Sequence, residues 1–178
     1  MDNISLVLLI IIITSILLII FLLIYNHFQT YIIKINIAEN NIDNTLREKF
    51  DFLTKGINII TDKTIKTEKE KELKELKELK ISNFELDREL VKIFNNYTVI
   101  KEDKINNSKN FNTLLNELKE NDEQLAAYKG YYNKNITKYN KMVKMFPSNI
   151  VSKIARLEEK PFYDGKDMTD DDEQDFKL

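Results

Sequence analysis

An apolar run without a single charged side chain begins at Ile4 and ends at Ile24. Its polar members, Ser5, Thr14 and Ser15, carry hydroxyls that can donate to the carbonyls of their own helix. About 21 residues of helix rise about 31 Å, which matches a bilayer hydrocarbon core of about 30 Å. We therefore predict that this run contacts the lipid bilayer and that residues 1–27 are a transmembrane anchor with a short flank.

The flanks of the run favour an uncleaved anchor over a signal peptide. No lysine or arginine precedes it, and no small-residue cleavage pattern follows it. Tyr25, Phe28 and Tyr31 stand where an interfacial aromatic belt is expected, with His27 among them. Lys34 is the nearest basic residue, so the positive-inside rule predicts a single-pass protein of the cell membrane with its C-terminal body in the cytoplasm.

Composition excludes several classes of protein. The chain has no cysteine and one histidine, which rules out disulfides and zinc–thiolate sites and argues against a zinc enzyme. The formal net charge of −2 gives no reason to expect nucleic acid as a partner. Three glycines and two prolines are too few for a fold built on tight turns. We predict an all-α fold with long helices, no metal and no cofactor.

Residues 32–61 place apolar side chains three, four and seven apart, and no proline separates them from the anchor. The anchor helix can therefore continue into this segment. Residues 62–80 repeat Lys-Glu-Leu, which we interpret as a helix with a solvated face. We expect that helix to continue to Tyr97, and a loop from Thr98 to Lys109.

The segment from Phe111 to Phe146 carries a heptad seam with alternating steps of four and three. Two seam members are charged, Asp122 and Lys129. They either pair with charges on the first body helix or reach water at the edge of the seam, and both alternatives stay open. The candidate partners on that helix are Asp43, Arg47, Lys49 and Asp51.

A helix–turn motif, Phe146, Pro147, Ser148 and Asn149, is expected to end this helix, because proline disfavours helix at the residue before it. A short helix over residues 150–157 should fold back. Residues 161–178 carry seven acidic residues and two lysines, so we expect a disordered, solubilising tail, with a docking motif as the alternative.

The C-terminal half resembles the LemA family. The residues that carry the resemblance are Asn110-Phe111, Leu114, Leu118, Asp122, Leu125, Lys129, Tyr132-Asn133, Tyr139-Asn140 and Phe146-Pro147-Ser148-Asn149, with Ile42-Asp43, Leu46, Asp51 and Leu53 in the first body helix. The family often has Arg-Arg where this chain has Glu48-Lys49, and Asp122 and Lys129 replace a glutamate and an arginine.

The resemblance implies an antiparallel, up-and-down four-helix bundle over residues 28–160, tethered to the bacterial envelope, and it implies no established reaction. Tyr132 and Tyr139 are seven residues apart, with Asn133 and Asn140 beside them. We interpret these pairs first as a polar layer that fixes helix register and second as a site for a peptide or a lipid headgroup.

Three functions compete. The first is a non-catalytic interaction or scaffold module that binds a membrane protein or a second copy of itself. The second is a transmembrane sensing or signal-relay domain that works with a separate output protein. The third, a hydrolase using Asp43, Asp51 and Asp122, needs a cleft that joins these carboxylates, and thin bundles rarely offer one. We predict no enzymatic activity.

Overall fold

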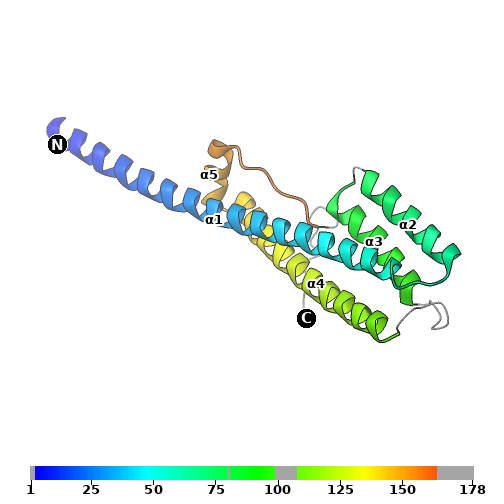
Figure 1. The fold of residues 1–178 in the computed structure, drawn as a ribbon. Helices are drawn as coiled ribbons and strands as arrows, with labels where there is room; N and C mark the ends of the chain where they lie inside the picture. Colours follow the sequence, from blue (N-terminus) through cyan, green and yellow to red (C-terminus); the bar gives the residue numbers. More distant parts are fainter. Residues whose placement is uncertain (1–2, 80, 99–107, 164–178) are drawn as a thin grey trace. The chain divides into compact units, whose positions relative to one another are not determined.

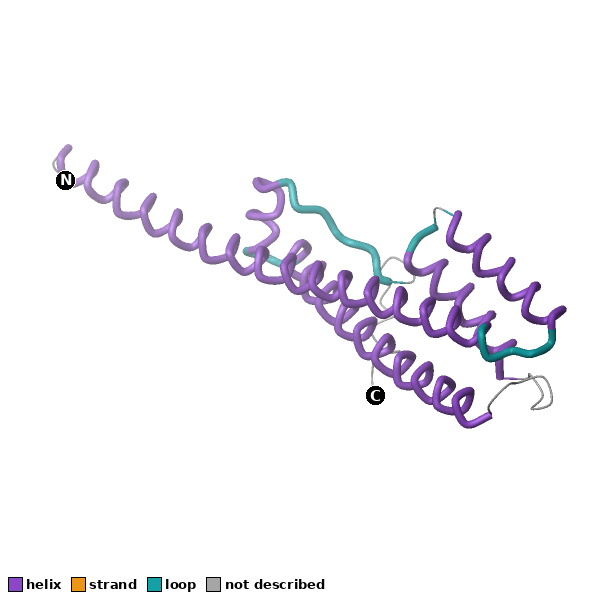
Figure 2. The backbone as a smooth tube through the Cα atoms, viewed as in Figure 1, coloured by secondary structure: helices purple, strands orange, loops and turns teal. Residues whose placement is uncertain are grey.

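The computed structural model describes residues 3–79, 81–98 and 108–163. This part of the chain holds five helices and no strand (Figure 1, Figure 2). The predicted all-α class is thereby confirmed. The helices are α1 (Asn3–Ile57), α2 (Lys63–Glu78), α3 (Asn83–Thr98), α4 (Ser108–Lys144) and α5 (Ser148–Ala155).

Helix α1 runs without interruption from the apolar run into the body of the protein, as the absence of proline predicted. It is the one described helix that is long and apolar enough to cross a membrane. The hydroxyls of Thr14 and Ser15 donate to the carbonyls of Ile10 and Ile11 at 2.7 and 2.8 Å. The hydroxyls of Thr14 and Ser15 are therefore satisfied inside the helix, which is the condition for placing them in lipid.

The chain divides into two compact units, and α1 and α4 contribute to both. Unit 1 consists of the described residues within Met1–Ile37 and Tyr132–Leu178, and unit 2 is the described part of Ala38–Tyr131. The core of unit 1 is a cluster of buried side chains, Phe28, Ile35, Ile136, Tyr139, Val151 and Phe162.

Unit 2 buries the apolar stripes of four helical segments, the second half of α1, α2, α3 and the first half of α4. The repeating leucines of α2 supply Leu73 and Leu76 to this interior, while most of its lysines and glutamates face solvent, as expected for an amphipathic helix. The other buried apolar residues include Ile42, Leu46, Leu53, Leu90, Ile93, Leu118 and Leu125.

The prediction of one helix from residue 62 to Tyr97 is wrong, because α2 ends at Glu78 and α3 begins at Asn83. A capping box starts α3: the Ser82 backbone N–H donates to Glu85 Oε2 at 3.0 Å, and the Glu85 N–H donates to Ser82 Oγ at 3.3 Å. The Ser82 N–H and the Ser82 hydroxyl both donate to Glu85 Oε2, and these two hydrogen bonds lower the pKa of Glu85. The Ser-x-x-Glu signal was present in the sequence, and the helical period on both sides of it obscured it.

Two other predicted boundaries shift or fall outside the described residues. The short helix expected over residues 150–157 is observed as Ser148–Ala155. The seam was expected to reach Phe146, but α4 ends at Lys144 and Phe146 is exposed. Most of the predicted loop, residues 99–107, and residues 164–178 of the acidic tail lie outside the described residues.

Candidate functional site

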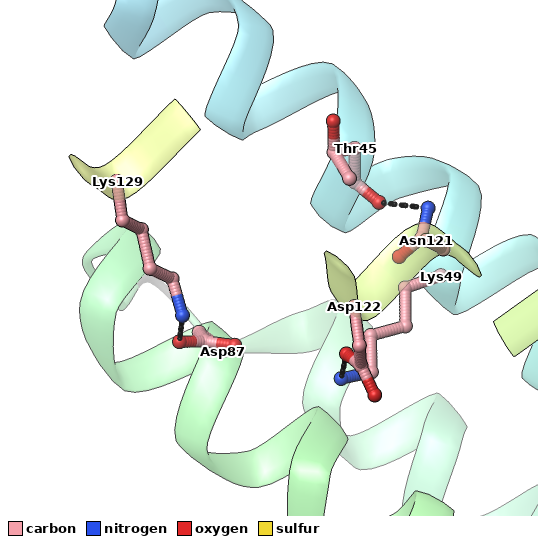
Figure 3. Close-up of polar contacts among 6 residues, drawn as sticks. All are labelled: Thr45, Lys49, Asp87, Asn121, Asp122 and Lys129. Atoms are coloured by element: carbon pink, nitrogen blue, oxygen red, sulfur yellow. Dashed lines mark hydrogen bonds and ion pairs between the residues drawn. The ribbon is translucent and has the colours of Figure 1, made fainter. Parts of the chain in front are cut away.

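Unit 2 contains a fully buried lysine, Lys49, whose Nζ lies 2.5 Å from Asp122 Oδ1 (Figure 3). The Phe94 ring lies beneath the same ammonium, with its centroid 5.8 Å from Nζ. Asp122 keeps about a third of its side chain exposed, at 34%. The pair therefore links α1 to α4 through an ammonium withdrawn from water, an arrangement that is stable only while its counter-ion is present.

A second ion pair joins Lys129 of α4 to Asp87 of α3 (Figure 3). Of the two alternatives left open by the sequence, pairing with the first body helix is observed for Asp122, whereas Lys129 is paired with a different helix. The partner of Asp122 was among the four candidates on the first body helix. The partner of Lys129 was not, because Asp87 belongs to a helix whose start the sequence analysis had misplaced.

A buried amide completes this polar interior. Asn121 Nδ2 donates to the Thr45 carbonyl at 3.1 Å (Figure 3). Among the described residues, Asp87 Oδ1 and Asn121 Oδ1 accept no hydrogen bond. Sequence reasoning missed Asn121, although it lies three residues after Leu118 and four before Leu125, which is the spacing of a core-facing position.

The candidate residues Asp43, Arg47 and Asp51 lie together at the rim of an open groove of about 420 Å³. Arg47 Nε donates to Asp43 Oδ2 at 2.8 Å. This hydrogen bond and the negative charge of Asp43 raise the pKa of Arg47. Lys77 adds a second basic group to the rim. The apolar lining of the groove comes from Leu46, Phe50, Leu76, Leu79, Ile81 and Leu86.

The two asparagines of the Tyr-Asn pairs bind the backbone of the segment that follows α5. Asn140 donates to the Lys160 carbonyl at 2.8 Å and accepts from the Lys160 N–H at 2.9 Å. Asn133 Oδ1 accepts from the Tyr163 N–H at 2.9 Å. Phe162, between these two contacts, is buried in the core of unit 1. The sequence analysis had assigned Phe162 and Tyr163 to the tail.

The seven-residue spacing of these asparagines matches an extended chain that runs opposite to α4. Seven helical residues rise about 10 Å, and three residues of extended chain cover about the same distance. The side chain at 140 therefore meets residue 160, and the one at 133 meets residue 163. The asparagines hold a non-helical segment in register along α4. The sequence analysis had instead interpreted them as a polar layer between helices.

The tyrosines of the two pairs pack edge to face against aromatic rings. Tyr139 meets Phe28 of α1 with centroids 5.7 Å apart, and Tyr132 meets Tyr163 at 6.3 Å. Burial, with a smaller effect from Glu158, raises the pKa of the Tyr139 phenol. The aromatic halves of the pairs thus fill the core of unit 1 while the amide halves fix the chain beside it.

The turn after α4 is held by serine hydroxyls. Ser148 Oγ donates to the Met142 carbonyl at 2.6 Å and Ser152 Oγ to the Val143 carbonyl at 3.3 Å. These carbonyls belong to the last turn of α4, where no further turn of the helix follows to supply backbone N–H groups to them. Of the predicted motif residues, Pro147 stands at the position just before α5 and the Asn149 N–H donates to the Met145 carbonyl at 2.8 Å.

The described residues contain no group of three or more side chains suited to hold a metal ion. Asp43 and Asp51 border the same groove, whereas Asp122 is not among the residues that line it and bonds to Lys49 instead. The three carboxylates proposed for a hydrolase are therefore not joined by this groove. Its surface combines an apolar lining with a rim of two acids and two bases, which is suited to binding.

Comparison with known proteins adds one match. The model of the LemA family matches residues 38–176. A search of curated proteins and a search of solved structures each returned no match.

Proposed function

The chain belongs to the LemA family, and we propose that it is a membrane-anchored, non-catalytic interaction module of the bacterial envelope that binds a partner protein through the groove of unit 2. The observation that carries this proposal is the groove itself, where four charged side chains surround an apolar lining. Leu79 is 56% exposed there, so an apolar side chain of a partner can cover it and gain from the removal of both surfaces from water.

The anchor supports the tethering half of the proposal. Residues 4–20 expose their apolar side chains, and such a surface is stable only in lipid or against another apolar surface. We place the span at residues 4–24 and the C-terminal body in the cytoplasm by the positive-inside rule. We further infer that the long helices form an antiparallel, up-and-down bundle. The contact of Phe28 with Tyr139 in unit 1 supports the packing of α1 against α4 that such a bundle requires.

Site-specific photocrosslinking in intact membranes tests the proposed partner. A photoreactive amino acid at Leu79 is expected to give a covalent adduct with a membrane protein or with a second copy of the chain. The matched control places the same amino acid at Lys74, which is exposed on α2, the helix that ends just before Leu79, but does not line the groove. Adducts at both positions with equal yield, or at neither, would reject the groove as the binding surface.

A charge change on the rim distinguishes specific capture from chance contact. Lys77→Glu alters the rim without removing any of the apolar lining. We expect it to lower the yield of the Leu79 adduct, while Lys71→Glu on the outer face of α2 leaves the yield unchanged. Lys71 is exposed and pairs with Glu75 in the same helix at 3.7 Å.

A sensing or signal-relay function is the second candidate, and the continuity of α1 favours it. One helix, Asn3–Ile57, contains the apolar run and also supplies Asp43, Arg47 and Asp51 to the groove. A proline in a helix interior removes a hydrogen bond and costs about 3 kcal/mol or more, so Lys34→Pro should interrupt this connection. If the chain relays a signal, Lys34→Pro abolishes the output and Lys34→Ala preserves it; unchanged output in both variants would reject the relay.

A further inference from the structure

Unit 1 exposes a group of large apolar side chains at the end of α4 and on α5. We call it the α5 ridge, and it consists of Met145, Phe146, Ile150 and Ile154. Phe146 is 77% exposed and Ile154 is 65% exposed, while Val151 of the same helix as Ile154 is buried in the core. Ile150 and Ile154 are four residues apart on one helix and therefore share a face.

The position of α5 along α1 gives the ridge a neighbour. Residues 3–20 of α1 are exposed all round, and Phe21 is the first residue that packs against the core cluster of unit 1, followed by Ile24 and Tyr25. Val151 of α5 belongs to that same cluster. Figure 1 shows α5 beside α1, just after the free N-terminal part of that helix.

The length of the free part of α1 places this packing at the membrane surface. Eighteen residues, 3–20, span about 27 Å, which is less than the hydrocarbon core of about 30 Å. The apolar run continues to Ile24, so the last turn of the span lies alongside the folded body. The part of unit 1 that covers this turn is therefore level with the bilayer surface.

The charges around the ridge suit an anionic lipid surface. Lys141, Lys144, Lys153 and Arg156 are all exposed in this region. Lys144 pairs with Glu159 at 3.0 Å, and Glu158 is also exposed here, so the four basic side chains outnumber the two acidic ones around the ridge. Basic side chains flanking an apolar helix face are the pattern of helices that lie in the membrane interface.

We propose that the α5 ridge inserts into the interface of the same bilayer that residues 4–24 span. The ridge would then be a second contact with lipid that fixes the orientation of unit 1 at the membrane. This inference rests on the proposed membrane anchor. Lipid is the occupant because α5, which carries half of the ridge, packs on the same core cluster as Phe21 and Ile24, at the level where the apolar run of α1 ends.

Quenching of tryptophan fluorescence by brominated lipids tests the proposal, because the chain contains no tryptophan of its own. The full-length chain is reconstituted into vesicles of mixed phosphatidylcholine and phosphatidylglycerol, with bromines near the top of the acyl chains. Phe146→Trp and Ile154→Trp are measured separately, so that a folding defect in one variant does not decide the result. For each we expect at least about a twofold loss of fluorescence relative to unbrominated vesicles.

Two further variants separate the possible outcomes. Leu17→Trp lies inside the proposed span and should be quenched; Tyr131→Trp lies 13 residues, about 20 Å, before the end of α4 and should not be. Quenching at Leu17 without quenching at Phe146 and Ile154 would overturn the inference and leave the anchor standing. Absence of quenching at Leu17 would remove the anchor itself. Equal quenching at Tyr131 and at the ridge would also overturn the proposal.

Discussion

Lys49 is buried completely, and its ammonium is neutralised by one carboxylate, that of Asp122. Removing one partner of a buried ion pair leaves an uncompensated charge, which is much more destabilising than replacing both partners by apolar groups. The sequence predicted the seam position of Asp122 from its heptad spacing. It did not distinguish Lys49 from the other charges of α1, because pairing depends on which face of that helix meets α4.

We expect Asp122→Ala to lower the free energy of unfolding by about 3 kcal/mol in urea titrations of the full-length chain in detergent micelles. Adding Lys49→Met to this variant should restore most of the loss, since the stranded ammonium is then gone. The control is Asp43→Ala, which breaks the solvent-exposed pair with Arg47 and should have a much smaller effect. Equal losses for the two single variants would show that the Lys49–Asp122 pair does not stabilise unit 2.

Arg156 is the one described non-glycine residue with a positive φ, 53°, and it ends α5 in the left-handed region. The Leu157 N–H donates to the Ser152 carbonyl at 2.8 Å, which closes the helix in the Schellman pattern. Glycine is the usual residue at this position because a Cβ there is unfavourable by about 1–2 kcal/mol.

Arg156→Gly should therefore stabilise unit 1 by about 1 kcal/mol, measured by thermal or urea unfolding. Lys153→Gly is the matched control, because it introduces the same residue at an ordinary helical position of α5, where glycine is unfavourable by about 1 kcal/mol. The two substitutions should have opposite signs. A loss of stability with Arg156→Gly would contradict this account of how α5 ends.

At the scale of the elements, α1 was predictable as one long helix because nothing in its sequence interrupts the helical period. The start of α3 was harder, since the apolar period of residues 62–80 continues without a proline or glycine into the next segment. What separates the two helices is the reciprocal bonding of Ser82 and Glu85. This capping box spans four residues, whereas helical periodicity is judged over a much longer stretch, so the periodicity did not show the break.

The Ser82–Glu85 capping box predicts a pH dependence of stability. Hydrogen bonds from Ser82 lower the pKa of Glu85 in the folded state, so the stabilisation is present above the unfolded-state pKa and is lost as the pH falls through the lower folded-state value. Unfolding titrations of the wild type and of Glu85→Gln should therefore converge as the medium is acidified. A constant difference between them at all pH values would contradict the assignment.

The packing of the segment after α5 on α4 could not be predicted, because Asn133 and Asn140 bond to backbone groups. Every residue has such groups, so the sequence does not show which of them the asparagines bind. Asn140 is buried and uses its amide both as a donor and as an acceptor. Asn133 is only partly buried, and its bond to the Tyr163 N–H uses the amide oxygen as an acceptor.

This difference gives a matched pair of substitutions. Asn140→Asp replaces a donor with a carboxylate facing the Lys160 carbonyl and should cost about 2 kcal/mol, with faster amide exchange at Lys160. Asn133→Asp keeps the acceptor for the Tyr163 N–H, so stability and exchange should be close to those of the wild type. Hydrogen exchange measured by mass spectrometry over residues 157–163 is the readout. Similar exchange in both variants would contradict the proposed division of roles.

At the scale of the whole molecule, the resemblance and the family match agree, and the all-α class followed from few glycines and prolines together with long helical periods. The sequence could not reveal the groove, because Leu76 and Leu86 reach it from two helices that had been interpreted as one. A membrane-anchored module and a second lipid contact through the α5 ridge both require that residues 4–24 cross a bilayer.

Labelling of single cysteines with a membrane-impermeant thiol reagent tests that premise directly, since the chain has no cysteine of its own. Asn3→Cys and Asn112→Cys place one exposed thiol before the span and one at the start of α4. We predict that intact cells label Asn3→Cys alone and that Asn112→Cys reacts only after the membrane is permeabilised. Labelling of both positions from the same side of an intact membrane would show that residues 4–24 do not span it.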